Sequence, residues 1–306
     1  MCSLIEEGRK KIIDSKVLPF IVKCLSNQNE NMKIVACKCI KGLSRSIPEL
    51  RSNLLDFGVA DPLIELLEDK LDEIKILSCS CLCNIIMDFA PMKKYFVEKK
   101  GVKILVKYTK STNSLLKLNS IWALKNLSLR CSFEIKKKIL ETIKVNGICE
   151  LLEDEDSNIQ EQCLNLLRNI ASGDFEDISF LINELNEKLI PILIDKLKSN
   201  NHRVIVQTLY VISNISAGNL NQKDKIMNSN VLKFILNFLS SSSSDKHIKV
   251  AALWILINLT WKGDKGVEER KKVLNELKCD QYLTQLANDT ELDVRDRVKQ
   301  VIDQLK

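Results

Sequence analysis

The sequence IWALKNLS at residues 121–128 returns as LWILINLT at residues 253–260, with Trp and Asn in matching places. Three further segments share the pattern of Leu or Ile, any residue, Asn, and then Leu or Ile. Successive asparagines of this pattern are 42, 43, 45 and 44 residues apart, which indicates an internal repeat. The repeated positions are Asn84, Asn126, Asn169, Asn214 and Asn258.

Two further helical patterns recur between one Asn segment and the next. The one just before each Asn segment reads, for example, VLPFIVKCL at 17–25 and VLKFILNFL at 231–239, and a polar break such as KSNNHR at 198–203 separates it from the Asn segment. Three helices in 40 to 47 residues are typical of armadillo or HEAT units. We therefore predict an all-α, armadillo-type right-handed superhelical solenoid of about seven three-helix repeats. The predicted single array covers residues 1–306, with repeat ends near 46, 90, 131, 173, 218, 263 and 306.

Composition agrees with a helical protein that neither crosses a membrane nor binds nucleic acid. With 9 Gly and 5 Pro, the chain is poor in turn residues, and no apolar run approaches the roughly 18 residues of a membrane span. The net charge of +6 comes from Lys and Arg interleaved with Asp and Glu, so we expect no nucleic-acid partner. The apolar residues between Ile12 and Ile21 begin a repeat unit almost at once, which suggests that the chain starts partway along a longer solenoid.

The candidate chemical sites are weak. Cys79, Cys81 and Cys83 are close in sequence, but Cys81 faces away from the other two on a helix, so we interpret them as buried thiols. No nucleotide-binding loop occurs, and we expect neither His202 nor His247 to have a catalytic Cys or Asp partner nearby in sequence, while pairs formed in space stay open. We therefore predict no enzyme activity, no cofactor, no metal and no small-molecule substrate. The serine run at 240–244 is interpreted as a solvated loop, with a phosphorylation segment as the alternative.

The repeated Asn has two possible roles. Asn costs about 0.6 kcal/mol against Ala inside a helix, so its recurrence needs a reason. Its amide could tie neighbouring helices together, or it could bind the backbone of an extended peptide, because it offers both a donor and an acceptor. At 100° per residue, Trp122 and Asn126 lie outside the apolar arc, as do Trp254 and Asn258, and Tyr210 with Asn214 repeats the arrangement.

The Trp-x-x-x-Asn pairs resemble the armadillo repeats of nuclear import adaptors, which hold basic peptides. Those adaptors place acidic residues beside the pair, whereas Arg130 and Lys262 follow Asn126 and Asn258 here. A face with these cations suits an acidic segment or a terminal carboxylate. A nuclear-transport or other peptide-binding adaptor is kept as the alternative function.

A second resemblance covers nearly the whole chain. The stretch AALWILINLTWKGDKGVEERKKVL at 251–274, together with LCNIIMDFAP and LLRNIASG, is similar to the C-terminal half of the armadillo repeat-containing protein 8 family. That family provides the armadillo scaffold of the GID/CTLH E3 ubiquitin ligase. The resemblance implies a non-catalytic cytoplasmic and nuclear subunit that contacts core subunits and holds the substrate-receptor subunit's tail in a concave groove. The candidate groove residues are Trp122, Asn126, Arg130, Asn169, Tyr210, Asn214, Trp254, Asn258, Trp261 and Lys262.

Overall fold

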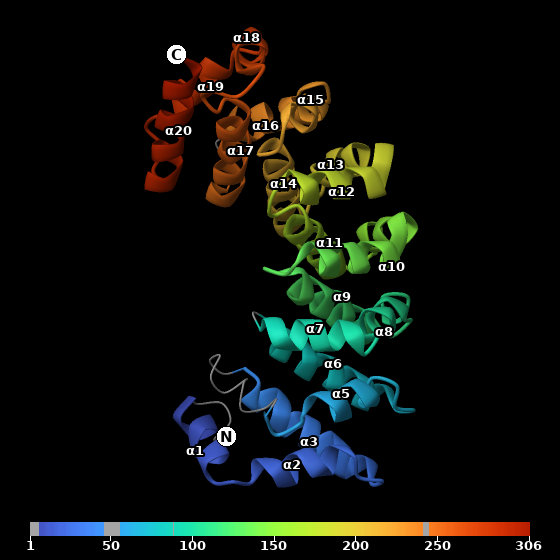
Figure 1. Cartoon of the computed structure of the whole chain (residues 1–306). Helices are drawn as coiled ribbons and strands as arrows, with labels where there is room; N and C mark the ends of the chain where they lie inside the picture. Colours follow the sequence, from blue (N-terminus) through green and yellow to red (C-terminus); the bar gives the residue numbers. More distant parts are fainter. Residues whose placement is uncertain (1–5, 46–55, 88, 241–244) are drawn as a thin grey trace. The chain divides into compact units, whose positions relative to one another are not determined.

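The computed structural model describes residues 6–45, 56–87, 89–240 and 245–306 (Figure 1). Within these ranges every regular element is a helix, which confirms the predicted all-α fold. None of the described helices is both long and apolar enough to cross a membrane. Residues 241–244 of the serine run lie outside the described residues, so neither interpretation of that run is tested.

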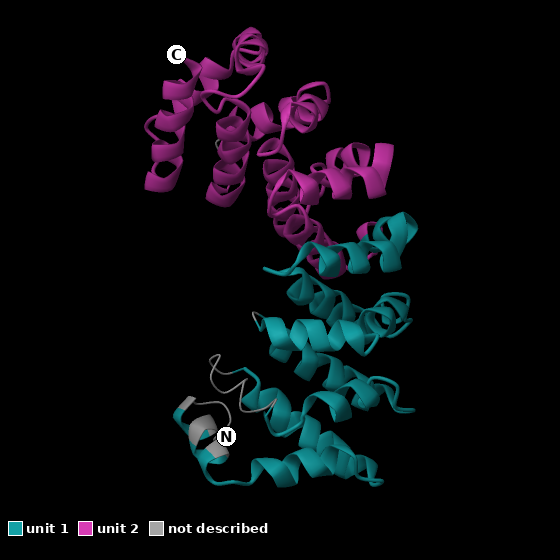
Figure 2. Cartoon of the chain, in the orientation of Figure 1, with its two compact units in different colours: residues 1–151 teal, residues 152–306 magenta. Residues whose placement is uncertain are grey.

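The chain divides into two compact units, residues 1–151 and 152–306 (Figure 2). Unit 1 contains α1 to α10, and α10 reaches the boundary. Its helix bounds are α1 Glu6–Asp14, α2 Leu18–Leu25, α3 Glu30–Leu43, α5 Ala60–Leu66, α6 Asp72–Ile86, α7 Ala90–Glu98, α8 Gly101–Tyr108, α9 Ser114–Ser128 and α10 Phe133–Leu152.

Unit 2 contains the remaining helices and one short 3-10 turn. The bounds are α11 Ser157–Ile170, α12 Phe175–Leu185, η2 Asn186–Lys188, α13 Leu189–Lys196, α14 His202–Ser216, α15 Leu220–Met227, α16 Val231–Ser240, α17 Lys246–Leu259, α18 Val267–Glu276, α19 Cys279–Leu286 and α20 Leu292–Leu305.

The helices that carry the repeated pattern recur as the sequence predicts. They are α3, α6 and α9 in unit 1 and α11, α14, α17 and α20 in unit 2, and each predicted repeat boundary falls just after one of them. We call them the third helices. Within each unit, consecutive third helices pack directly against one another. Helix α10 contains Lys144 at φ 60° and ψ 163°, so it comprises two helices joined by a sharp bend, in keeping with a three-helix repeat.

Polar side chains from the breaks cap five of the seven third helices, whereas α6 and α20 begin without a side-chain cap. An Asn or Asp side chain accepts a hydrogen bond from a backbone N–H of the first turn, and such a cap stabilises a helix by about 1 kcal/mol. This cap fixes where each of these five helices begins. The capping residues are Asn29, Asn113, Asp156, Asn201 and Asp245.

The predicted apolar arcs form the core of each unit. Ile121, Leu124 and Leu127 of α9 are fully buried in unit 1. The equivalent side chains of α17 are fully buried in unit 2. Each contributes roughly 1.5–3 kcal/mol through its removal from water. This burial fixes the rotation of the third helices and thereby the direction in which their Trp, Tyr and Asn side chains point.

A close approach between α7 and α8 leads to a first prediction. Gly101 begins α8, and a Cβ atom there would overlap the fully buried ring of Phe96. We expect Gly101→Ala to lower the free energy of unfolding by about 1–3 kcal/mol, because a packed core resists added volume. Phe96→Leu in the same chain should relieve part of this loss. Urea denaturation of both single variants and the double variant would measure the coupling.

Gly147→Ala is the matched control, because its Cβ would meet only Ile143 Cγ2 at 4.0 Å. This helical glycine should tolerate Ala or become more stable. Equal effects at Gly101 and Gly147 would contradict the overlap.

Candidate functional site

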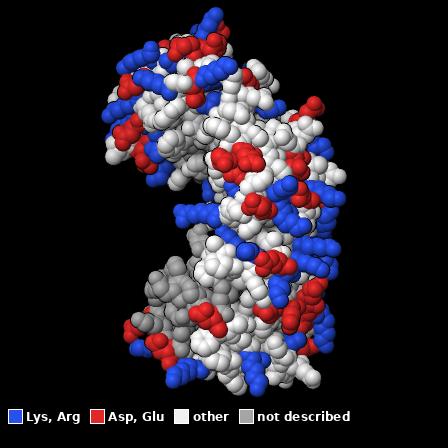
Figure 3. All heavy atoms as spheres, in the orientation of Figure 1, with Lys and Arg blue, Asp and Glu red and all other residues white. Residues whose placement is uncertain are grey.

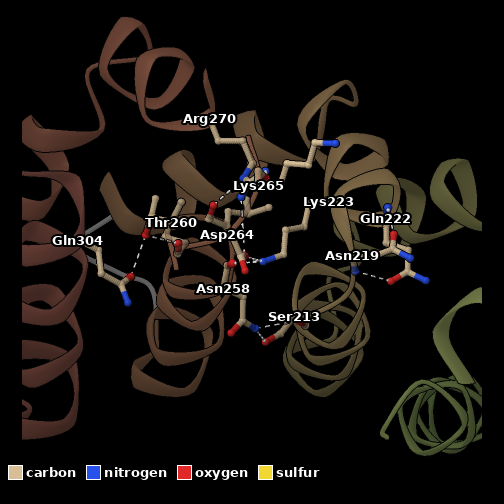
Figure 4. Close-up of polar contacts among 12 residues, drawn as sticks. Ser213, Asn219, Gln222, Lys223, Asn258, Thr260, Asp264, Lys265, Arg270 and Gln304 are labelled. Carbon is tan, nitrogen blue, oxygen red and sulfur yellow. Dashed lines mark hydrogen bonds and ion pairs between the residues drawn. The ribbon is translucent and has the colours of Figure 1, made fainter. Parts of the chain in front are cut away.

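The repeated Asn side chains bind neighbouring third helices together. At Asn126, Asn214 and Asn258 the amide Nδ2 donates to a backbone carbonyl one repeat earlier, at the residue just before the equivalent Asn. This regular register confirms the inter-helix role of the repeated Asn. We call a repeated Asn position, with the side chains of the third helix around it, a rung, and Figure 4 shows the rung at Asn258. The pairs are Asn126 with Cys83 (2.9 Å), Asn214 with Arg168 (2.9 Å) and Asn258 with Ser213 (3.0 Å).

The first and last rungs use other polar groups. Asn84 Nδ2 donates to Ser44 Oγ at 3.1 Å in unit 1. At the other end, Gln304 occupies the repeated position, and its Oε1 accepts from the buried Thr260 hydroxyl at 2.9 Å (Figure 4). Side-chain hydroxyls thus replace a backbone carbonyl as the partner at both rungs.

Burial separates the repeated asparagines into two groups. Asn126 and Asn169 are 3% and 4% exposed, so a peptide has little access to their amides. Asn214 and Asn258 are half-buried. Each amide has a second N–H and a carbonyl oxygen beyond the group used for the inter-helix bond. In unit 2, therefore, a rung side chain is able both to join helices and to meet a ligand.

The aromatic side chains of the rungs reach the surface. Trp122 of α9 is 43% exposed, and Trp261, in the turn after α17, is 53% exposed. Tyr210 of α14 and Trp254 of α17 are half-buried. The exposure of Trp122 agrees with its predicted position outside the apolar arc. Unit 2 brings together Tyr210 and Asn214 on α14 with Trp254 and Asn258 on α17, the helix packed against it.

A cation lies over three of these four aromatic rings. Such contacts stabilise by about 0.5–1 kcal/mol where solvent reaches them. They also place positive charge beside each flat ring. In unit 1 Lys125 lies 5.4 Å from the Trp122 ring centre, and in unit 2 Arg168 lies 5.5 Å from Tyr210 and Arg297 5.0 Å from Trp254.

The two predicted groove cations lie in the turns that follow third helices. Arg130 is exposed, has φ 47°, and lines a cavity of about 530 Å³ between α7 and the start of α10 in unit 1. Lys262 is exposed next to Trp261 in unit 2. Elsewhere, blue and red side chains mix over the visible surface of both units, as the interleaved sequence charges predict (Figure 3).

Buried charges hold the turn that carries Trp261 and Lys262. Lys223 of α15 is 4% exposed and donates to the Asn258 carbonyl at 2.8 Å and to the Asp264 carboxylate. Arg270 of α18 is 3% exposed and donates through Nε to the Leu259 carbonyl at 2.7 Å. These cations satisfy carbonyls that the end of a helix leaves without partners. We call Lys223, Asp264 and Arg270 the turn clamp (Figure 4).

Sequence reasoning did not predict the turn clamp. The insert at 261–266 was its visible signal, because a generic repeat does not require Asp264 or the glycines around it. Gly263 and Gly266 have φ values of 87° and 73°, a region that side chains with a Cβ rarely occupy. The insert is therefore a turn of defined conformation.

The cysteine and histidine interpretations have different outcomes. Cys79 and Cys81 are fully buried, and burial raises the pKa of both thiols well above the ordinary value, as expected of inert core residues. The expectation that neither histidine has an Asp partner nearby in sequence is wrong for His247. Both histidines contact Asp245, which lies two residues before His247 and reaches His202 through the packing of α14 on α17.

Comparisons with known proteins agree with the helical repeats. The VID28/GID5 C-terminal domain family matches residues 103–304. Armadillo repeat-containing protein 8 of Xenopus laevis is 32% identical over 302 residues, which are 98% of this chain and 41% of that protein. GID complex subunit 5 of Schizosaccharomyces pombe is 28% identical over 349 residues, covering 97% of this chain and 44% of that protein.

Among solved structures, a crystal structure of computationally designed armadillo repeat proteins for modular peptide recognition is similar at a TM-score of 0.69. It is 23% identical in sequence and covers 79% of this chain and 99% of its own. This likeness shows the armadillo fold. The chain spans less than half the length of the two curated relatives that it matches.

Proposed function

Because this chain belongs to the VID28/GID5 C-terminal domain family, we propose that it is a non-catalytic scaffold subunit of a GID/CTLH-type E3 ubiquitin ligase. The name of the Schizosaccharomyces pombe relative, GID complex subunit 5, supports membership of that complex. We further propose that the chain contacts core subunits and holds the extended tail of the substrate-receptor subunit. The third-helix face of unit 2 is the proposed dock.

One observation carries the docking proposal. Tyr210 and Trp254 lie at equivalent positions of two packed helices, each with an arginine over its ring and a half-buried Asn one turn away. Packed helices are about 8–10 Å apart, and three extended residues span about 10 Å. Successive rungs would therefore meet every third residue of an extended peptide. The rings would cover aliphatic side-chain stems.

The charge of this face indicates the kind of tail. Arg168 and Arg297 lie over the rung aromatics, and exposed Lys262 follows in the clamped turn. Guanidinium groups bind carboxylates through strong, charge-assisted hydrogen bonds. We infer a tail that contains acidic residues or ends in its own carboxylate there. A basic peptide, as a nuclear-transport adaptor would carry, would meet like charges.

The test is fluorescence anisotropy with a labelled C-terminal tail peptide of the substrate-receptor subunit. We expect Trp254→Ala to weaken binding by at least about 30-fold, because buried aromatic anchors contribute 2 kcal/mol or more at interfaces. Tyr210→Ala should act in the same direction. A reversed-charge peptide, with Lys in place of each Asp and Glu, should bind more weakly.

Phe175→Ala is the matched control, since Phe175 is a 58% exposed aromatic residue of unit 2 at the start of α12, away from the rungs. Circular dichroism of every variant would verify folding. No binding by the intact chain, or equal losses in Trp254→Ala and Phe175→Ala, would contradict the dock. Tighter binding of the reversed-charge peptide would favour the transport-adaptor alternative.

A further inference from the structure

The two histidines of the chain meet at one carboxylate. His202 is the first residue of α14, and His247 is the second residue of α17. His202 Nε2 lies 3.0 Å from Asp245 Oδ1, and His247 Nδ1 lies 2.8 Å from the same oxygen. The two imidazole rings are 6.2 Å apart in an edge arrangement, at 80° to each other.

The helix start holds this carboxylate in place. Asp245 is the N-cap of α17, and its Oδ1 accepts the backbone N–H of His247 at 2.7 Å. That backbone hydrogen bond is the largest cause that lowers the pKa of Asp245, to about 2, with the two imidazoles adding to it against the effect of burial. The carboxylate is therefore ionised throughout the neutral pH range.

We propose that His202, Asp245 and His247 form a binding site for a divalent transition metal of the zinc class. Two imidazole nitrogens and one carboxylate oxygen are donors that zinc accepts, with a fourth position left for water or a partner's side chain. The three ligand atoms lie within 4.8 Å of one another. This site rests on a different observation from the peptide dock and does not depend on it.

The distances suit the ion after a small adjustment. Zinc bonds of about 2.0–2.2 Å place tetrahedral ligand atoms about 3.4 Å apart. Both contacts to Asp245 are shorter than this and would lengthen by about 0.4–0.6 Å, while the two histidine nitrogens would approach each other by up to about 1.4 Å. The side chains are 45%, 43% and 58% exposed for His202, Asp245 and His247, so rotation meets little packing.

The surrounding charges limit the affinity. The site lies at the N-terminal ends of α14 and α17, where helix dipoles disfavour a cation. Three nearby cationic side chains are each paired with a carboxylate, which offsets the repulsion between these side chains and a bound metal ion. These pairs are Arg203 with Glu161 (3.9 Å), Lys246 with Glu291 (3.5 Å) and Lys249 with Asp289 (2.8 Å). We therefore expect zinc binding in the micromolar range.

Titration of the intact chain with zinc chloride tests the site. Isothermal calorimetry should give one ion per chain. Proton NMR should show shifts of both histidine Hε1 resonances, and because the chain has two histidines, both of these resonances report on this site. Asp245→Asn is the decisive variant, because Asn caps a helix about as well as Asp but lacks the charge. It should weaken zinc binding at least tenfold and leave the helical circular dichroism unchanged. His202→Gln and His247→Gln should each do the same.

Three outcomes would overturn the site. Zinc that binds without shifting the histidine resonances would be bound elsewhere, for example at a thiol. Equal affinity in the intact chain and in Asp245→Asn would exclude the carboxylate as a ligand. The absence of binding at about 1 mM zinc, far above the micromolar expectation, would reject the proposal outright.

Discussion

Replacing Asp264 by Ala is expected to lower the free energy of unfolding of unit 2 by about 3 kcal/mol, because the change leaves two buried cations without their counter-ion. Lys223 and Arg270 are 4% and 3% exposed, and among the described residues both form their ion pairs with Asp264. Their hydrogen bonds to carbonyls remain, but neutral acceptors compensate a buried charge less well. Asp264 itself is 32% exposed, which places the loss at the lower end of the range for buried pairs.

Hydrogen exchange is the sharper measurement for this change, because repeat arrays open locally. Amides from the end of α17 to the start of α18 should lose protection first in Asp264→Ala. Urea unfolding would give the free-energy change. Lys265→Ala is the matched control, since its exposed side chain lies in the same turn. If both variants unfold alike, the turn clamp contributes no stability.

The fold was predictable because one period organises the whole sequence. Five asparagines at nearly constant spacing indicated the third helices, and polar breaks indicated their starts, where the structure places side-chain caps such as Asn113 and Asn201. A helical wheel then gave the buried arc and the outward direction of Trp122. The helix starts, the buried arc and the direction of Trp122 all depend on residue spacing within one helix or on equivalent positions of successive repeats. Both are visible in the sequence.

The departures from prediction depend on contacts that a helical wheel does not include. Asn126 and Trp122 share an arc on α9, yet α6 covers Asn126 and leaves Trp122 43% exposed. Asp245 joins His202 only through the packing of α14 on α17, 43 residues apart in sequence. These contacts depend on which neighbouring helix covers a residue, so the pattern within one helix gave no sign of them.

Asn126→Asp would separate the inter-helix role from side-chain shape, because Asn and Asp are nearly isosteric. The change replaces the Nδ2 donor, which lies 2.9 Å from the Cys83 carbonyl and 3.1 Å from Cys83 Sγ, with an oxygen that repels that carbonyl. The site is 3% exposed, and Oδ1 of Asn126 already lacks a hydrogen-bond partner there. We expect unit 1 to lose about 3 kcal/mol at pH 7, since a buried ionised carboxylate without a partner is costly.

The pH dependence of this loss identifies its cause. Burial and the facing carbonyl should raise the folded-state pKa of the introduced carboxyl above its unfolded value of about 3.9. A raised pKa means that the folded state favours the protonated acid, whose O–H is able to donate to the Cys83 carbonyl. The contribution of the protonated form is complete below about pH 3.9 and is lost as pH rises through the folded pKa. The gap between variant and parent should therefore be smaller at pH 5 than at pH 7 in urea titrations.

Asn258→Asp provides the comparison within the same chain. Asn258 makes the equivalent bond to the Ser213 carbonyl at 3.0 Å, but it is half-buried, so water would solvate the new carboxylate. Its loss should be smaller and less dependent on pH than that of Asn126→Asp. If the two variants lose the same free energy at both pH values, burial does not distinguish the rungs. The assignment of Asn126 to helix joining, and of Asn258 to joining and ligand contact, would then fail.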